Sequence, residues 1–187
     1  MTFEINGLCD VDQSISNKLL SAIDMQHWTI NESRQKRFKA HRFTKTILLR
    51  HTKDFAFNNF KFVNYEMFEY YKSFTDKYLE AISPHFEIKD YTALIVKLRP
   101  SSVIGTHVDG GSRFFQLGHR LHIPVKTNDK VFFDVGSTRT NMKVGKIYEI
   151  NNLAPHRVEN QSKESRIHLI MDIFDKSIEE YPEYWMN

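Results

Sequence analysis

The sequence predicts a mostly β protein of the α+β class, with helices in its N-terminal part and an antiparallel jelly roll at residues 86–175. Two observations carry this prediction. After Ser83-Pro84 the chain becomes a series of short β-prone runs separated by turn residues, whereas before it apolar residues recur at helical spacing. No helical crossover lies between the β-prone runs, which favours antiparallel sheets over βαβ units.

The N-terminal part is expected to hold two main helices and one strand. Ser14 is expected to cap the first helix, and a longer helix should follow Asn64. The apolar positions on these helices are Ile15, Leu19, Leu20 and Ile23, then Tyr65, Phe68, Tyr71, Phe74, Tyr78 and Ile82. Residues 44–50 are apolar and β-branched, so a strand is expected there. We expect a single domain over residues 1–187, in which residues 1–85 form a helical extension that packs on a core at residues 86–187.

The strands of the jelly roll are expected wherever β-prone residues run between turn signals. The expected strands are Tyr91–Leu98, Val103–His107, Gln116–Val125, Val131–Val135, Lys146–Asn151 and Ser165–Phe174. Gly110-Gly111, Asn128-Asp129, Gly136-Ser137 and Gly145 separate them. Many short strands at close spacing are typical of a sandwich or barrel.

Two of these strands alternate apolar residues with charged or histidine residues. Residues 119–125 place Arg120 and His122 on one face, and residues 166–172 place Arg166, His168, Ile170 and Asp172 on one face. Such a face either lies in water, as in an ordinary strand, or lines the polar interior of a barrel. Taken strand by strand, the pattern favours the solvated alternative.

Composition and charge argue against several classes of partner. The chain has one cysteine, Cys9, no run near the ~18 apolar residues of a membrane span, and no signal-peptide pattern at its start. We therefore expect a cytoplasmic protein without membrane contact. The net charge of +3 is dispersed, which argues against a nucleic-acid partner. The densest basic cluster, Arg34 to Lys45 with His41, is expected to be a solvated loop or helix face.

Three residues form a candidate metal site. His107-Val108-Asp109 places an imidazole and a carboxylate on one face at the end of an expected strand, and His156 follows later. The H-x-D pattern alone is weak, because a chain of this composition is expected to contain a chance match. Two neutral imidazoles and one carboxylate, however, form the facial triad that suits Fe(II) and leaves coordination positions open.

An arginine follows this set at the start of the last expected strand. A 2-oxo acid fills two open positions of such a metal and O2 fills the third, so the far carboxylate of the acid must be held by the protein. A guanidinium suits this task because its planar fork gives a carboxylate two parallel hydrogen bonds. Arg166 is placed for that role, which indicates a 2-oxo acid with a second carboxylate as a co-substrate.

The segment from Gly105 to Asp172 resembles the aspartyl/asparaginyl β-hydroxylase family, which includes free-proline cis-3-hydroxylases. The matching stretches are Gly105-Thr-His-Val-Asp109, His119-Arg-Leu-His-Ile-Pro124, Gly145-Lys-Ile-Tyr-Glu-Ile-Asn-Asn152, His156-Arg-Val-Glu-Asn160 and Arg166-Ile-His-Leu-Ile-Met-Asp172. The resemblance implies a cupin-like double-stranded β-helix with His107, Asp109 and His156 as iron ligands. It also implies that Arg166 binds the outer carboxylate of 2-oxoglutarate, and that Arg120 and His122 lie near its inner carboxylate.

The resemblance further implies an Fe(II)/2-oxoglutarate-dependent dioxygenase that hydroxylates an amino acid or an amino-acid residue in a peptide. Membrane-anchored animal members have Gly in place of Asp109, whereas the proline-hydroxylase branch has the full triad. Arg113 and Gln116, which follow Gly110-Gly111, either contact the substrate from a loop over the iron or lie on a plain surface loop. Residues 1–85 match no pattern of the family.

Two alternatives stay open at this point. One is a cupin metalloenzyme that does not use 2-oxoglutarate, against which Arg166 and Arg120 argue. The other is a non-catalytic jelly-roll ligand-binding module, which would not need His107, Asp109 and His156 together. His168 shares a face with Arg166, and either lies near 2-oxoglutarate or is a satisfied core histidine, the interpretation we favour.

Overall fold

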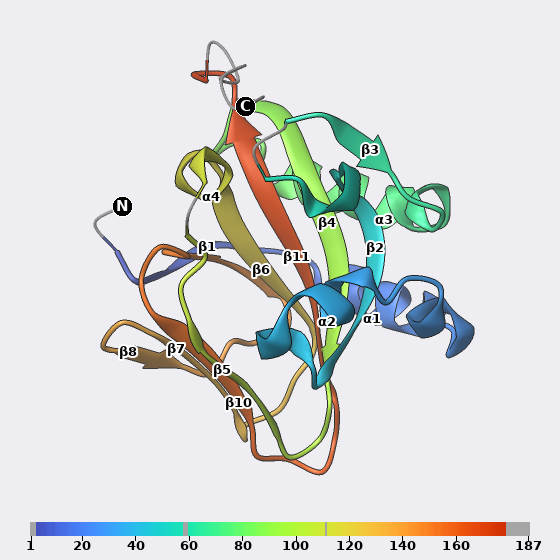
Figure 1. The fold of residues 1–187 in the computed structure, drawn as a ribbon, viewed down its shortest axis with the longest axis vertical. Coiled ribbons are helices and arrows are strands. Elements are labelled where there is room, and N and C mark those ends of the chain that lie inside the picture. Colours follow the sequence, from blue (N-terminus) through green and yellow to red (C-terminus); the bar gives the residue numbers. More distant parts are fainter. Residues whose placement is uncertain (1–2, 58–59, 111, 179–187) are drawn as a thin grey trace.

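The computed structural model describes residues 3–57, 60–110 and 112–178, and folds them around two antiparallel sheets (Figure 1). Within these ranges, the larger sheet has the strand order β1-β9-β6-β11-β4-β2-β3 and the smaller sheet the order β5-β10-β7-β8. The strands are β1 Ile5–Asp10, β2 Thr44–Thr52, β3 Phe62–Asn64, β4 Ile88–Leu98, β5 Ser102–His107, β6 His119–Lys126, β7 Val131–Val135, β8 Thr138–Thr140, β9 Lys146–Ile150, β10 His156–Asn160 and β11 Arg166–Asp175. The predicted fold class, a mostly β jelly roll with helices, is confirmed.

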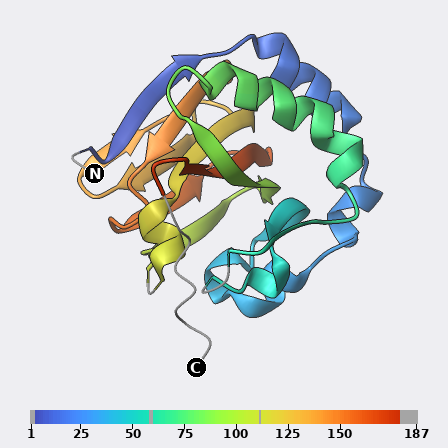
Figure 2. The same cartoon turned by 90° about the horizontal axis from the view of Figure 1, so that it is seen from above.

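Helices cover the outer face of the larger sheet (Figure 2). The helices are α1 Gln13–Ala22, α2 Ser33–Arg37, α3 Phe68–Ile82 and α4 Arg113–Leu117, with the short 3₁₀ helices η1 Gln26–Thr29, η2 Lys39–His41 and η3 Lys53–Phe55. The apolar stripes of α1 and α3 pack on the sheet through Leu19, Tyr71 and Tyr78, which are at most 1% exposed. Burial of these rings and of the sheet residues beneath them makes this layer the main hydrophobic core.

The strand β11 shows how the other face of the sheet becomes a polar interior. Ile167, Leu169 and Met171 point into the outer core, as period-two alternation requires. The alternate residues Arg166, His168 and Asp172 point toward the smaller sheet and are at most 2% exposed. The solvated interpretation of this face is therefore wrong, because the smaller sheet covers it.

Most of the expected elements are confirmed within a few residues. The expected strand at residues 131–135 coincides with β7, and the helix expected after Asn64 begins at Phe68. The first helix is capped by Asp12 and not by Ser14, since the Asp12 carboxylate accepts a hydrogen bond from the Ser14 backbone N–H at 2.8 Å.

The N-terminal segment differs from the expected helical extension. In addition to its helices and to the strand β2, which was expected at residues 44–50, it contributes β1 and β3 to the two edges of the larger sheet. The strand β1 carries little alternation of burial, so a two-residue period was not visible in its sequence.

The expected strand at residues 116–125 begins only at His119, after the helix α4. Phe114 and Phe115 of α4 pack against Phe174 of β11 in a cluster of aromatic rings. The turn between α4 and β6 approaches the same ring closely: a Cβ on Gly118 would lie 3.2 Å from Phe174. These ring contacts are tertiary, which is why a β-prone composition did not reveal the helix.

Candidate functional site

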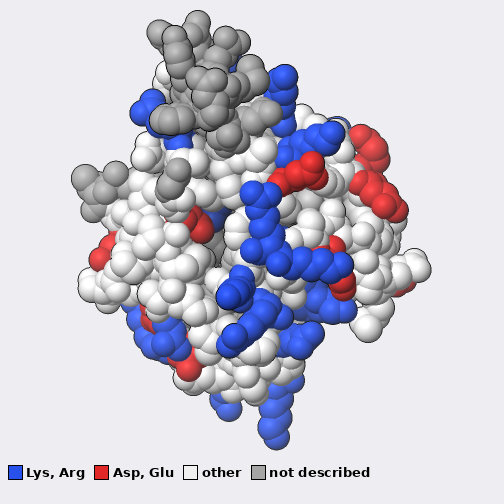
Figure 3. All heavy atoms as spheres, in the orientation of Figure 1, with Lys and Arg blue, Asp and Glu red and all other residues white. Residues whose placement is uncertain are grey.

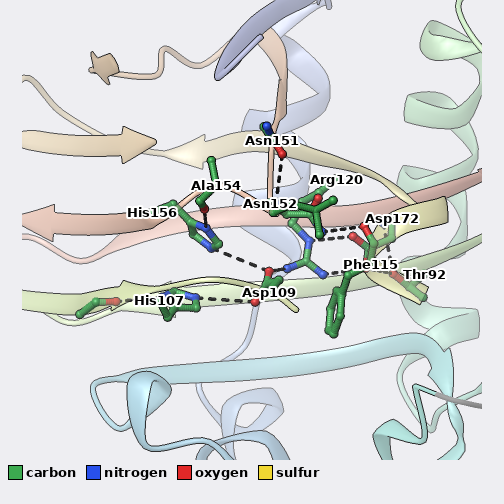
Figure 4. Close-up of polar contacts among 12 residues, drawn as sticks. Thr92, His107, Asp109, Phe115, Arg120, Asn151, Asn152, Ala154, His156 and Asp172 are labelled. Carbon is green, nitrogen blue, oxygen red and sulfur yellow. Dashed lines mark hydrogen bonds and ion pairs between the residues drawn. The ribbon is translucent and has the colours of Figure 1, made fainter. Parts of the chain in front are cut away.

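The smaller sheet brings two histidines and an aspartate together at the ends of neighbouring strands. His107 is the last residue of β5, His156 is the first residue of β10, and the two residues face each other in the ladder. Asp109 lies two residues beyond the end of β5, held by a backbone hydrogen bond to the Asn152 carbonyl at 3.0 Å. One ligand atom from each of the three side chains lies within 4.8 Å of the other two (Figure 4). The convergence of these side chains, expected from the sequence, is what the structure shows.

Backbone carbonyls fix which nitrogen of each ring faces the cluster. Nδ1 of His107 lies 2.8 Å from the Gly105 oxygen, and Nδ1 of His156 lies 2.9 Å from the Ala154 oxygen. Because a carbonyl only accepts, both Nδ1 atoms carry the proton, and both Nε2 atoms present a lone pair. Each Nε2 lies 3.8 Å from an oxygen of Asp109. Hydrogen bonds of this kind orient histidine ligands in metal sites.

The environment keeps both imidazoles neutral. Burial is the main cause that lowers the pKa of His156 to about 4; the hydrogen bond to Ala154 raises this pKa, and the neighbouring His107 and Arg120 lower it. Burial also lowers the pKa of His107, assisted by the charges of Arg120 and Arg34. Neutral imidazoles are the form that binds a metal, so the donor set is ready for one near pH 7.

A charged row runs behind Asp109 on the larger sheet. Arg120 of β6 and Asp172 of β11 face each other in the ladder, and the guanidinium holds the Asp172 carboxylate with contacts of 2.7 and 3.0 Å. The same guanidinium contacts the Asp109 carboxylate through Nη1 (Figure 4). Burial alone would raise the pKa of Asp172, but the charge of Arg120 holds it below its usual value. Arg120 therefore links a buried carboxylate to the metal-binding cluster.

Arg166 lies deeper between the sheets and has no carboxylate partner among the described residues. Its side chain is 1% exposed, its Nη2 donates to Nδ1 of His168 at 2.5 Å, and its Nε has no partner. Burial lowers the pKa of Arg166 to about 9. Nearby, Nδ1 of His122 is buried without a partner, and burial and the charge of Arg166 lower the pKa of this ring. A buried cation without an anion is costly, so this pocket suits an anionic ligand.

Two adjoining cavities connect these groups to the surface. The inner one, of about 40 Å³, reaches Arg166, His122 and His156. The outer one, of about 450 Å³, has a size typical of small-molecule sites and opens beside α2 and η2. The residues that line both cavities are Arg34, His41, His107, Asp109, Arg120 and Ile170. The outer cavity also has a wall of aromatic rings: Phe38, His51, Phe55, Phe57 and Phe115.

The two cavities together are called the chamber below. Not every residue that the sequence predicted for the site lies in it. Arg113 and Gln116 are exposed on α4, and neither is among the described residues that line these two cavities, because the helix turns Phe114 and Phe115 inward instead. The expected substrate loop is thus a short helix that contributes rings. His168 is buried, and its Nδ1 accepts a hydrogen bond from Arg166, whereas its Nε2 has no partner among the described residues, so the ring is only half satisfied.

Other residues enter the site unexpectedly. The segment from Arg34 to His41 was expected to be solvated, yet both of these residues line the chamber, since α2 packs on β2 and η2 packs on β5. For Asp172 the sequence analysis gave only a polar position on a strand. The alternation of β11 could have placed it in the site, because period two puts Asp172 on the same face as Arg166.

A family model for aspartyl/asparaginyl β-hydroxylases matches residues 44–176, which is more than half of the chain. The chain belongs to this family. As a member of the β-hydroxylase family, it carries its metal-binding cluster, Arg120 and Arg166 within the matched range, whereas α1 and α2 lie before it. A comparison with curated proteins finds no match.

Solved structures share the fold of this β-hydroxylase family member at low identity. A prolyl-4-hydroxylase from Pseudomonas putida is 10% identical with a TM-score of 0.55, over 92% of this chain and 91% of that chain. The viral collagen prolyl hydroxylase from Paramecium bursaria Chlorella virus 1, solved as a 2OG complex, is 11% identical with a TM-score of 0.54, over 93% and 97%. A 2OG-Fe(II) oxygenase family oxidoreductase from Burkholderia pseudomallei is 14% identical with a TM-score of 0.50, over 70% and 66%.

None of the helices in the described part of the chain is long and apolar enough to cross a membrane.

Proposed function

We propose that this protein is an Fe(II)/2-oxoglutarate-dependent dioxygenase that hydroxylates an amino acid or an amino-acid residue in a peptide. One observation carries the proposal: a His-Asp-His cluster with its lone pairs directed inward shares a chamber with a buried guanidinium that lacks an anion. The family and the fold of the solved oxygenases support the same reaction class.

The iron would be held by His107, Asp109 and His156. Two imidazole nitrogens and one carboxylate are the donor set of non-haem Fe(II) oxygenases, and such a set leaves positions open. The structure supports this assignment through the two fixed Nδ1–H tautomers and the carboxylate between the Nε2 atoms. When bound, iron with 2-oxoglutarate and O2 supplies the oxidising chemistry, while the protein provides binding and orientation.

Arg166 would hold the outer carboxylate of 2-oxoglutarate. Its fork can give two parallel hydrogen bonds to a carboxylate, and its hydrogen bond to His168 limits the directions it can take. His122, with its unpartnered Nδ1, would contact the inner carboxylate. Arg120 was expected beside that carboxylate too, but Asp172 and Asp109 occupy its guanidinium. We therefore assign to Arg120 the orientation of Asp109.

The substrate would occupy the outer cavity. Its aromatic wall suits the apolar part of an amino acid. The complete triad favours a free amino acid over a protein side chain, since the membrane-anchored peptide hydroxylases lack the equivalent of Asp109.

A turnover assay tests the proposal directly. The iron-loaded protein should convert 2-oxoglutarate to succinate, and the rate should rise with one class among free amino acids, peptides containing Asp or Asn, and methylated oligonucleotides. Mass spectrometry should find one added oxygen in that substrate. His156→Ala should abolish turnover and also metal binding, which calorimetry measures. His119→Ala is the control and should preserve both, because His119 pairs with Glu149 outside the metal-binding cluster.

The alternatives give different results in the same assay. A cupin metalloenzyme would bind iron through the cluster without consuming 2-oxoglutarate. A non-catalytic binding module would keep its ligand unchanged. Stimulation by the oligonucleotides alone would refute the amino-acid substrate but not the iron site.

A further inference from the structure

Arg34 is a second guanidinium in the chamber that lacks an anion. It lies on α2, and its side chain lines both the inner and the outer cavity, together with His107 and Asp109. Its Nη1 is buried and has no hydrogen-bond partner among the described residues. No ion pair within the described ranges includes it either. A guanidinium stays charged at physiological pH, so this arrangement leaves a charged donor unsatisfied.

The unsatisfied donor is not relieved by its neighbours. Burial is the main cause that lowers the pKa of Arg34 to about 9, and the nearby charge of Arg120 adds to it. His41, which also lines both cavities, is kept neutral because burial and the charge of Arg34 lower its pKa. A buried donor without a partner among the described residues calls for an explanation, and an anionic ligand in the adjoining cavity would supply one.

The charges of the chamber leave room for one more anion. Arg34, Arg120 and Arg166, which line the inner cavity, supply three positive charges, and Asp109 and Asp172 supply two negative charges; Arg37 and Lys39 line only the outer cavity. The proposed Fe(II) ion and doubly charged 2-oxoglutarate would cancel each other. One positive charge then remains, and it lies on the side of the outer cavity, since Arg34 lines that cavity and Arg166 does not.

We propose that Arg34 binds a carboxylate of the substrate, so that the site accepts anionic substrates and discriminates against their neutral amides. This inference rests on the proposed function and names the substrate class of the same site. The aromatic wall formed by Phe38, Phe55, Phe57 and Phe115 would contact the apolar part of such a substrate. Arg34 is therefore a specificity-determining residue contributed by a segment that precedes the range matched by the family model.

The surface at the entrance fits an anionic substrate. Lys and Arg side chains gather over α2 and the segment beside it (Figure 3). Arg37 and Lys39 from this segment line the outer cavity, where the only carboxylate among the described lining residues is Asp109. A mouth with positive charge raises the local concentration of anions and speeds their entry.

A binding experiment with matched pairs tests the role of Arg34. The full-length protein is loaded with Fe(II) and saturating 2-oxoglutarate without O2, and each probe is titrated by calorimetry. The pairs are proline and prolinamide, phenylalanine and phenylalaninamide, and an end-capped peptide with Asp or with Asn. In at least one pair the carboxylate should bind about tenfold or more tightly than the amide, as expected for a hydrogen bond between charged groups.

Variants on one helix separate a specific contact from a general effect of charge. Arg34→Gln should remove the carboxylate preference, while 2-oxoglutarate should still bind through Arg166. Lys36→Gln makes the same change of charge at an exposed position of α2 that lines neither cavity, and it should keep the preference. Arg34→Lys, which keeps the charge but not the fork, should retain part of it. The melting temperature of Arg34→Gln should not fall, because the side chain has no hydrogen bond to lose.

The result that overturns the inference is distinct from one that overturns the proposed function. A preference that survives Arg34→Gln, or no preference in any pair, removes the role of Arg34 but leaves iron and 2-oxoglutarate binding untouched. Arg34-dependent binding of a phosphoserine peptide in preference to the Asp peptide would likewise overturn the carboxylate assignment. Failure of 2-oxoglutarate itself to bind would count against the proposed function.

Discussion

The chamber has a buried arginine at each end, and the two arginines differ in whether a carboxylate of the protein pairs with them. At the end formed by Arg120, Asp172 and Asp109, one guanidinium meets two carboxylates within the protein. At the end formed by Arg166, His168 and His122, the guanidinium meets a neutral ring and no anion among the described residues. Both arginines come from neighbouring strands of one sheet, so the difference lies in their partners and not in the fold around them.

This contrast separates a structural pair from a ligand site. A buried ion pair whose partners are both present is strongly destabilised when one partner is removed, because the other charge is left alone. A buried cation without a partner already carries that cost in the free protein, and a ligand that brings the missing anion relieves it. Mutation of Arg120 should therefore lower the stability of the protein, whereas mutation of Arg166 should weaken the binding of the ligand.

The largest effect is expected at the balanced end. Arg120→Met keeps the length of the side chain but leaves Asp172 without its cation, so the free energy of unfolding should fall by about 3–5 kcal/mol. Arg166→Met removes a cation that has no anion, and the metal-free, ligand-free protein should keep its stability or gain some. Urea denaturation of both variants measures the difference. Equal losses would mean that the two ends do not differ in the way we describe.

The next effect belongs to the open end. Arg166→Met should weaken 2-oxoglutarate binding on the order of a hundredfold, because the buried charge pair with the co-substrate is lost. Arg157→Met is the matched control: Arg157 lies next to His156 but points away from the chamber and pairs with Glu159. Its dissociation constant for 2-oxoglutarate should stay within about twofold of the wild type. An unchanged constant in Arg166→Met would assign the co-substrate to another group.

A smaller effect is expected in the pH dependence of stability near the balanced end. His51 is 3% exposed, and burial is the main cause that lowers its pKa to about 4. The charge of Asp172 raises this pKa, and the charge of Arg120 lowers it. Between pH 6.5 and about 4 the unfolded chain binds a proton at this ring and the folded chain does not. The free energy of unfolding should therefore decrease as the pH is lowered from 6.5 to about 4, and His51 should contribute about 1.4 kcal/mol per pH unit to this decrease.

His51→Phe replaces the ring with an apolar one among Phe55, Phe57 and Phe114. The slope of the unfolding free energy against pH between 6.5 and 4 should decrease by about 1.4 kcal/mol per pH unit in this variant, which corresponds to about one proton fewer taken up on unfolding. Equal slopes in the wild type and the variant would show that His51 titrates normally in the folded protein.

The smallest effect concerns the orientation of Arg166. His168→Leu removes the acceptor for Nη2, which should cost about 1 kcal/mol in 2-oxoglutarate binding, or roughly fivefold to tenfold in affinity. His168→Gln offers another acceptor and should recover most of the loss. If both variants bind 2-oxoglutarate like the wild type, His168 does not position the guanidinium.

The sequence predicted the residues of this chamber that follow local rules. His107 and Asp109 are two residues apart at the end of one strand, and Arg166, His168 and Asp172 follow the period of another, so an extended backbone with period two groups them. That the polar face is covered was not predictable strand by strand, because the cover is a second sheet. The outline of the jelly roll followed from short runs and turn residues.

Arg34 and His41 show where sequence reasoning stopped. A cluster rich in Lys and Arg is usually solvated, and nothing in its spacing indicates that α2 and η2 fold across the mouth of a cavity. Their position depends on contacts of α2 with β2 and of η2 with β5, and β5 is distant in the sequence. Arg113 and Gln116 failed for the opposite reason: a polar pair beside two glycines suggested a loop, but the neighbouring rings formed a helix that turned the pair outward.

The order of strands in the larger sheet also governs how this chain can fold. The strand β11 lies between β6 and β4, although it follows both in the sequence, and β4 in turn holds β2. During synthesis, β2, β4 and β6 emerge before the strand that joins them, so the sheet cannot close until residue 175 has left the ribosome. Pairing over such long separations makes folding slow and leaves strand edges exposed meanwhile. Both Arg166 and Asp172 belong to β11, so the interior of the chamber can form only in this late step.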